Sequence, residues 1–140
     1  MSLQIGLTDD IATCQSLRYR VFVEEQGVSL ADEQDGRDAE ALHMLARLES
    51  VPVGTARLLV SGDTAKIGRV CVLQEARGTG LGAAIINACL DVARAQAGVT
   101  RAKLGAQTHA LSFYEKLGFA AFGPIYDDAG IPHRDMERAL

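Results

Sequence analysis

The residues with the clearest chemical meaning form a glycine-rich loop, Arg77-Gly78-Thr79-Gly80-Leu81-Gly82, between a predicted strand and a predicted helix. Backbone N–H groups at the start of a helix have no partner within the helix, and the aligned peptide dipoles place partial positive charge there. Glycines let an anion approach the backbone closely, and an arginine can donate two hydrogen bonds to phosphate oxygens. The loop is therefore predicted to bind a phosphate or pyrophosphate group.

Three classes of phosphate-binding loop compete for this segment, and a turn without any ligand is the fourth interpretation. A nucleoside triphosphate loop needs a Gly-Lys pair, which the sequence lacks. A dinucleotide loop is loosely matched by Gly78-x-Gly80-x-x-Ala83, but no acidic residue follows about 20 positions on. The remaining class is the R/Q-x-x-G-x-G/A loop of acetyl-CoA-dependent N-acetyltransferases, which Arg77, Gly80 and Gly82 match.

The elements around the loop are predicted from hydrophobic periodicity and turn residues. Helices are expected from Ile11 toward Gln26, at 83–97, and from a capping box at Ser112 to Gly118. Strands are expected at 3–7, 41–49, 52–60, 64–73 and 101–106, with two more in 119–140 around a turn at 127–130. The acidic segment 29–40 is predicted to be a loop with room for one helical turn. Short links between the three middle strands indicate an antiparallel meander, so the fold class is α+β, with a mixed sheet.

Composition limits the protein class. The 140 residues suit one domain spanning 1–140, and 48% hydrophobic with 23% charged residues is typical of a folded protein. A formal charge of −4 argues against a nucleic-acid partner. Three cysteines without a C-x-x-C pair predict neither a disulfide framework nor a metal site, and they favour a reducing, cytoplasmic setting. We expect no membrane segment, because no apolar run is long enough.

A second motif strengthens the acetyltransferase interpretation. Phe113-Tyr114-Glu115-Lys116-Leu117-Gly118-Phe119 resembles the F-Y-x-x-x-G-F segment that follows the cofactor loop in the GNAT acetyltransferase superfamily. Further segments, spread from about residue 15 to 136, resemble the ElaA-like branch of that superfamily. They are Arg18-x-x-Val21-Phe22-Val23-x-Glu25-Gln26, His43, Ala56-Arg57-Leu58-Leu59, Gly68-Arg69-Val70, Gly105-Ala106-Gln107 and Gly130-Ile131-Pro132-His133.

The resemblance implies a GNAT-type fold and a donor site. The fold has a sheet of about six or seven strands, splayed between its fourth and fifth strands at 64–73 and 101–107, with three or four flanking helices. The pantetheine arm of acetyl-CoA would lie in the gap against Val70, Cys71 and Val72, with a main-chain N–H from this stretch polarising the thioester carbonyl. The loop Arg77–Gly82 would hold the pyrophosphate. The implied activity is direct acetyl transfer to a small-molecule or peptide amine by a chain able to form a homodimer.

Proton-transfer residues are less sharply defined. Tyr114 matches the family position whose phenol lies near the sulfur of CoA, so it is the expected general acid; plain core packing is the alternative. Glu25 and His43 are candidate general bases, and a structural role for His43 is the alternative. Cys71 as a nucleophile is disfavoured, because no neighbour in the sequence would lower its pKa.

The acceptor site is predicted only by charge. Four carboxylates in the loop after the first helix, Asp32, Glu33, Asp35 and Asp38, would suit a cationic acceptor. A solvated acidic loop is the alternative, because charge runs are usually exposed. Since no single base stands out, a non-catalytic acyl-CoA-binding or sensing module is the alternative function.

Overall fold

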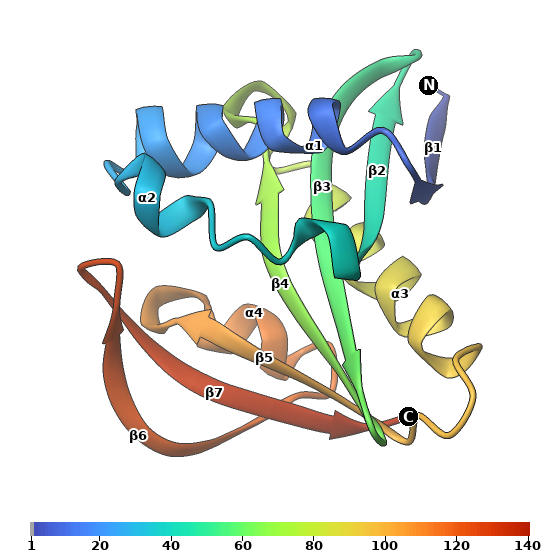
Figure 1. Ribbon diagram of the computed structural model, residues 1–140, viewed down its shortest axis with the longest axis vertical. Coiled ribbons are helices and arrows are strands. Elements are labelled where there is room, and N and C mark those ends of the chain that lie inside the picture. Colours follow the sequence, from blue (N-terminus) through green and yellow to red (C-terminus); the bar gives the residue numbers. More distant parts are fainter. Residues whose placement is uncertain (1) are drawn as a thin grey trace.

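One mixed sheet organises the computed structural model, which describes residues 2–140. Within these residues the sheet has seven strands in the order β1-β2-β3-β4-β5-β7-β6 (Figure 1). Their bounds are β1 Leu3–Thr8, β2 Leu42–Leu48, β3 Val51–Ser61, β4 Thr64–Val72, β5 Arg101–Gln107, β6 Ala120–Asp128 and β7 Ile131–Ala139. Neighbours are antiparallel except for β4 and β5, which are parallel. The predicted mixed fold is confirmed.

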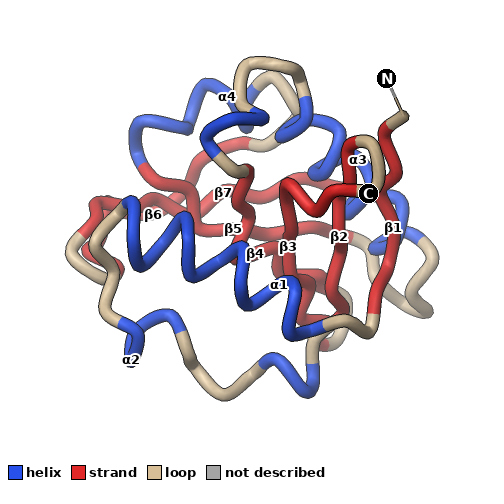
Figure 2. The backbone as a smooth tube through the Cα atoms, turned by 90° about the horizontal axis from the view of Figure 1, so that it is seen from above, coloured by secondary structure: helices blue, strands red, loops and turns tan. Residues whose placement is uncertain are grey.

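Helices cover both faces of the sheet. Helix α1 (Ile11–Arg18) and the short α2 (Leu30–Glu33) lie on one face, whereas α3 (Leu81–Arg94) and α4 (Leu111–Glu115) lie on the other (Figure 2). The chain after α1 continues as a π-helical segment, Tyr19–Glu25, so the predicted helix has the expected extent but a wider second half. No helix within residues 2–140 is long and apolar enough to cross a membrane.

Two apolar cores fix strand β4. The larger core lies between the sheet and α3 and includes Ile67 of β4, while the smaller core lies under α1 and includes Cys71 of the same strand. Helix α3 packs very closely on the sheet at Gly54, where a Cβ atom would stand 2.7 Å from Cδ1 of Ile85. Strand β4 is therefore held on both faces as well as by its pairing with β3.

Strand β5 leaves β4 after a short contact. The two strands are paired only over Thr64–Ile67 and Arg101–Leu104, and the pairing stops at Gly68 and Gly105. At the same level the β3–β4 register shifts between Thr55 and Arg57, and Arg69 has a φ of 51°, a left-handed conformation that is uncommon for a side-chain-bearing residue. This parting confirms the predicted splay between the fourth and fifth strands.

The predicted capping box at Ser112 is wrong. Helix α4 starts at Leu111, directly after a 3-10 turn at Thr108–Ala110, and its N-cap residue Ala110 makes no side-chain cap. Ser112 therefore lies inside the helix, because the preceding turn already sets the helical path. The turn predicted at 127–130 is confirmed, with Ala129 and Gly130 both at positive φ between β6 and β7.

Candidate active site

A cavity of about 900 Å³ occupies the region where β4 and β5 separate. This volume lies within the usual range of about 300–1,000 Å³ for small-molecule sites. On one side the cavity is lined by the glycine-rich loop, the start of α3 and the ring of Tyr114. On the other it is lined by the segment after α1, the acidic segment and the β6–β7 hairpin. It thus connects the predicted cofactor loop with the predicted acceptor region.

The glycine-rich loop forms a cradle made of backbone. Gly78 and Gly80 have φ values of 78° and 80°, and no other atom lies within 4 Å of where a Cβ would stand on either residue. Gly80 is the N-cap of α3, and the N–H of Ala84 donates to its carbonyl. The N–H groups of residues 81–83 precede that bond and so have no partner within the helix. These features fit a pyrophosphate group.

The side chains of the loop are engaged elsewhere. Arg77 donates from Nη1 and Nη2 to both carboxylate oxygens of Glu25, at 2.6 and 2.8 Å, and from Nε to the carbonyl of Val72 at 3.0 Å. Thr79 donates its hydroxyl to the Ala76 carbonyl, and the Leu81 side chain is buried in the core. The expected fork of Arg77 onto phosphate oxygens is therefore absent in this structure, because Glu25 occupies it.

The ion pair with Arg77 also affects the ability of Glu25 to act as a general base. The hydrogen bonds from Arg77 lower the pKa of the Glu25 carboxyl below its ordinary value. A carboxylate with a lowered pKa is a weaker proton acceptor, and both its oxygens are already bonded to the guanidinium. This geometry does not support the predicted base role of Glu25.

Strand β4 presents backbone, not the Cys71 thiol, to the cavity. Cys71 packs against Cys14 and Leu17 under α1, and burial raises the pKa of its thiol to about 12. It therefore stays protonated, which argues against a cysteine nucleophile. The N–H of Leu73 donates to Val53 of β3. Because N–H groups alternate along a regularly paired strand, that of Val72, which precedes Leu73, faces away from β3, toward the parted edge.

Tyr114 borders the cavity with its ring fixed by two neighbours. Edge-to-face contacts join it to Phe113, at 4.9 Å between ring centroids, and to Phe119, at 6.0 Å. Burial raises the pKa of the phenol to about 12, and no hydrogen bond contributes to that shift. Tyr114 therefore combines the packing role with a hydroxyl that remains a proton donor throughout the neutral range.

The acidic segment is held by arginines from three elements: Arg18 of α1, Arg57 of β3 and Arg69 of β4. The deeply buried Arg18 binds Glu33 from Nε at 2.7 Å and Asp38 from Nη1 at 2.8 Å. Arg57 binds Asp35 through both terminal nitrogens, at 2.7 and 2.9 Å, and also reaches Asp38 at 3.1 Å.

These pairs overturn the idea of four carboxylates waiting for a cationic acceptor. Glu33, Asp35 and Asp38 are already neutralised by arginines, and of the four only the exposed side chain of Asp32 has no ion-pair partner among the described residues. The alternative of a solvated acidic loop holds for most residues of the segment, which are exposed, but not for Glu33, which is buried.

His43 lies outside the large cavity. Its side chain is buried under the acidic segment, where Nε2 donates to the Asp38 carbonyl at 2.9 Å. The residue borders a smaller recess beside β1 instead. The structure does not bring His43 to the site, so its predicted role as a base has no geometric support.

His133, to which the sequence assigns no role, does border the cavity. Its Nδ1 is 2.7 Å from the Ile131 carbonyl. A carbonyl only accepts hydrogen bonds, so Nδ1 carries a hydrogen, and in the neutral form of the ring Nε2 is the nitrogen with the lone pair. The ring stacks on Tyr126 at 6.0 Å, and Tyr126 donates to Asp135 at 2.7 Å.

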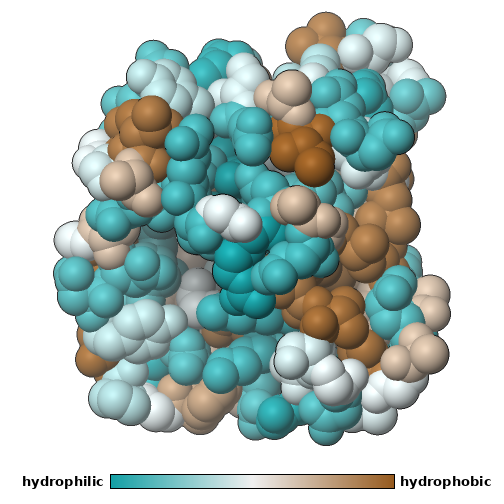
Figure 3. All heavy atoms as spheres, in the orientation of Figure 1, coloured by the Kyte–Doolittle hydropathy of each residue, from teal (hydrophilic) through white to brown (hydrophobic). Residues whose placement is uncertain are grey.

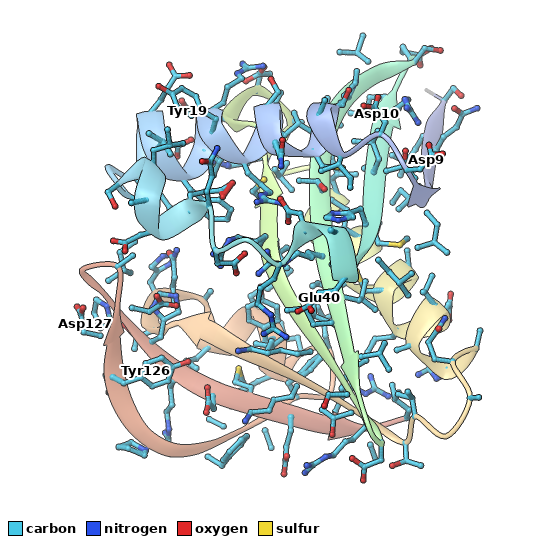
Figure 4. All side chains as sticks on the ribbon, viewed as in Figure 1. Asp9, Asp10, Tyr19, Glu40, Tyr126 and Asp127 are labelled. Carbon is cyan, nitrogen blue, oxygen red and sulfur yellow. The ribbon has the colours of Figure 1, made fainter. Side chains whose placement is uncertain are left out.

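A glycine makes room for this arrangement. Figure 4 shows Tyr126 and Asp127, neighbours on β6 near its hairpin with β7. The hydroxyl of Tyr126 crowds the position where a Cβ of Gly105 would stand, so a side chain at this position of β5 would displace Tyr126. The motif Gly130-Ile131-Pro132-His133, combined with strand alternation counted from the buried Met136, could have identified His133 as a site residue.

Comparisons with known proteins agree with this geometry. Residues 11–140 match the acetyltransferase (GNAT) domain family. A Bacillus subtilis protein provisionally named as an acetyltransferase is 42% identical over 133 residues, which cover 93% of this chain and 90% of that protein. An acyl-CoA N-acyltransferase from Pseudomonas aeruginosa is 31% identical, with a TM-score of 0.88 and coverage of 99% and 100% of the two chains.

The third comparison concerns ElaA of Escherichia coli. Its sequence is 33% identical over 128 residues, which cover 89% of this chain and 84% of ElaA. Its crystal structure superposes with a TM-score of 0.84 and covers 98% of each chain at 29% identity.

The chain therefore belongs to the GNAT acetyltransferase family. It is an acetyl-CoA-dependent N-acetyltransferase, with acetyl-CoA as the acyl donor and an amine as the acceptor. Within the family it falls in the ElaA-like branch, as the sequence motifs predict.

Asp38→Asn should reveal how strongly the arginine network holds the acidic segment. Removing one partner of a buried ion pair typically costs about 3–5 kcal/mol, so we expect a loss of about 3 kcal/mol in the free energy of unfolding at pH 7. The exposed Asp91→Asn is the matched control and should change it by less than about 0.5 kcal/mol. Urea unfolding would measure both.

The difference in free energy of unfolding between wild type and Asp38→Asn should depend on pH. Burial acts to raise the pKa of Asp38, but hydrogen bonds from Arg18 and Gln15 outweigh it, so the pKa in the folded state is lowered. The stabilisation is then complete above the unfolded-state pKa of about 3.9 and is lost as the pH falls below it. The gap between wild type and Asp38→Asn should therefore shrink in acid; a gap independent of pH would contradict the network.

Proposed function

We propose that residues 1–140 act as one catalytic domain in which the backbone N–H groups of the loop Arg77–Gly82 hold the pyrophosphate of acetyl-CoA. The observation that carries this is the pair of left-handed glycines, Gly78 and Gly80, with open space in front of unpartnered N–H groups at the start of α3. A helix N-terminus favours an anion through its free donors and dipole. Arg77 fixes the loop through Glu25 and Val72.

The gap between the strands suits the reacting end of the donor. Acetyl-CoA supplies a thioester, from which the acetyl carbon bonds to the amine nitrogen as the C–S bond breaks, with one proton leaving the nitrogen and one reaching the sulfur. We infer that an N–H of Val70 or Val72 donates to the carbonyl oxygen, a contact worth about 2.7–4 kcal/mol in other oxyanion sites. Tyr114, with its raised pKa and fixed ring, donates the proton to the sulfur.

His133 takes the place of Glu25 and His43 as the proposed base. Its Nε2 has a free lone pair because Nδ1 donates to Ile131, and its ring is held on Tyr126. It borders the same cavity as Tyr114. An acid and a base on opposite walls allow one proton to leave the amine while another reaches the sulfur.

The cellular setting and the assembly are also inferences. The acceptor is a small-molecule or peptide amine, and we infer a reducing cytoplasmic setting, because Cys14, Cys71 and Cys89 are free thiols. The exposed apolar side chains of the edge strand β6, among them Ile125 and Phe122, support pairing with a second copy of the chain.

Gly80→Val should abolish acetyl-CoA binding by placing a branched side chain in front of the free N–H groups. Loss of one or two charge-assisted hydrogen bonds predicts a Kd about ten- to a hundredfold weaker or more. Gly98→Val is the matched control, because Gly98 has a similar φ of 75° and open space but lies beyond the far end of α3. Calorimetric titration should find Gly98→Val unchanged; equal weakening in both variants would point to backbone strain instead.

Tyr114→Phe should lower kcat while leaving the affinity for acetyl-CoA nearly unchanged. Loss of general-acid catalysis typically costs about 10²–10⁴-fold. The exposed Tyr19→Phe is the control. Acetyl-CoA-dependent release of CoA, followed with a thiol reagent, measures both. Wild-type turnover in Tyr114→Phe would leave this residue with packing alone, and binding without any turnover in the wild type would indicate an acyl-CoA-binding module.

His133→Gln should lower kcat by about 10²-fold or more, the usual range for loss of a general base. The defect should shrink as the pH is raised toward the pKa of the acceptor amine, because solvent then supplies the neutral amine. A pH–rate profile of wild type and variant would show this convergence. A constant ratio at every pH would exclude His133 as the base.

A further inference from the structure

Arg69 is the least completely paired arginine of the acidic-segment network. Arg69 donates only through Nη2, to the carbonyls of Asp32 and Glu33 and to Asp35 Oδ2, at 3.1–3.3 Å. Its Nε is buried without a hydrogen-bond partner, and its Nη1 donates to no residue within 2–140. Arg18, by contrast, binds Glu33 through two nitrogens at 2.7 and 2.9 Å.

The pKa shifts also distinguish Arg69 from Arg18 and Arg57. Burial acts against the charge of all three, but the hydrogen bonds that Arg18 and Arg57 donate to carboxylates raise the pKa of these two arginines above the ordinary value. The pKa of Arg69 is instead lowered, by burial and by the neighbouring charge of Arg57. The surroundings of Arg69 therefore stabilise its charge less well than those of Arg18 and Arg57 stabilise theirs.

A second cation lies on the same wall. Lys66 borders the cavity, and no ion pair joins it to another residue within 2–140. Its neighbours Ala65 and Ile67 belong to the core under α3, so strand alternation turns Lys66 toward the face of α1 and α2. In Figure 3 hydrophilic residues surround a hollow near the centre of this face. Asp32 and Asp128 also border the cavity, and both are exposed.

The backbone conformation at Arg69 is also unusual. Arg69 has a φ of 51° at the bulge where β4 leaves β5, a left-handed conformation that is unfavourable for a residue with a side chain. The residue before it, Gly68, lies opposite Arg57 of β3. Arg57 also retains a buried Nε without a partner. Two neighbouring guanidinium groups therefore keep unused donors beside the gap.

We infer that the acceptor carries a carboxylate as well as its amine, and that Arg69, assisted by Lys66, binds this carboxylate. The guanidinium group matches a carboxylate in geometry and charge, and the bound anion completes the pairing that Asp35 only begins. The amine would then lie on the opposite side, toward His133. This assignment rests on the proposed function, and it reverses the charge that the sequence predicts for the acceptor.

The test compares amines that differ only in this group. The twenty common amino acids, β-alanine and 4-aminobutyrate are each assayed with acetyl-CoA beside their carboxamides. The carboxylate forms should have the higher kcat/KM, by about ten- to a hundredfold, the range for a charge-assisted hydrogen bond. In Arg69→Gln this ratio should fall toward one. Arg47→Gln, the same change at a residue outside the cavity, should leave the ratio unaltered.

Two further measurements keep the test valid if Arg69→Gln misfolds, and they separate failure of this inference from failure of the proposed function. Lys66→Gln, at an exposed position, should lower the same ratio several-fold even if Arg69→Gln is unstable. Thermal shift in the presence of CoA should show stabilisation by the carboxylate forms in wild type and not in Arg69→Gln. Preference for carboxamides, for cationic amines or for phosphorylated amines such as phosphoethanolamine would overturn the inference while the acetyltransferase stands. Absence of acetyl-CoA binding would instead overturn the proposed function.

Discussion

The parting of β4 from β5 is the constraint on which the site depends. A parallel pair that stops after four residues leaves backbone groups of both strands without the partners that a continuous sheet would provide. The opening persists because each strand is fixed elsewhere: β4 by β3 and by the two cores that Ile67 and Cys71 enter, and β5 by β7 along its whole length. The chain then leaves β4 through the glycine-rich loop, so the cavity, the backbone donors and the anion cradle arise at one place.

The second wall of the cavity is held by charge instead of apolar packing. Residues 29–40 show no apolar period, yet they are ordered because Arg18 of α1, Arg57 of β3 and Arg69 of β4 converge on their carboxylates. Buried ion pairs seldom add net stability over apolar contacts, but they are costly to break and specific in geometry. They therefore fix a segment in one position, which is what a binding wall requires.

The sequence predicts the features that depend on near neighbours. The meander, α3 and the glycine-rich loop follow from local periodicity and turn residues, and the two motifs identify the family. Pairing between distant charges could not be predicted. Arg77 and Glu25 are 52 positions apart, and the sequence alone suggests phosphate as the partner of Arg77 and a role as base for Glu25. Likewise, Arg18, Arg57 and Arg69 all stand in segments that resemble the ElaA-like branch, but only the fold shows that they meet. His133 needed the register of β7 before its face could be known.

The charge of the acceptor wall depends on the ionised side chains that have no ion-pair partner, and not on the total number of acidic and basic residues. Three carboxylates are consumed by arginines, so the unused donors of Arg69 and Lys66 set the local sign. These donors come from β4, whereas His133 comes from β7, with β5 between them. In a continuous sheet two strand spacings would amount to about 10 Å, but β4 and β5 have already parted at the level of Arg69, so the span there is wider. The acceptor's carboxylate and amine would then be bound from different walls of the cavity, and a long polyamine would be disfavoured because one of its ends would meet a cation.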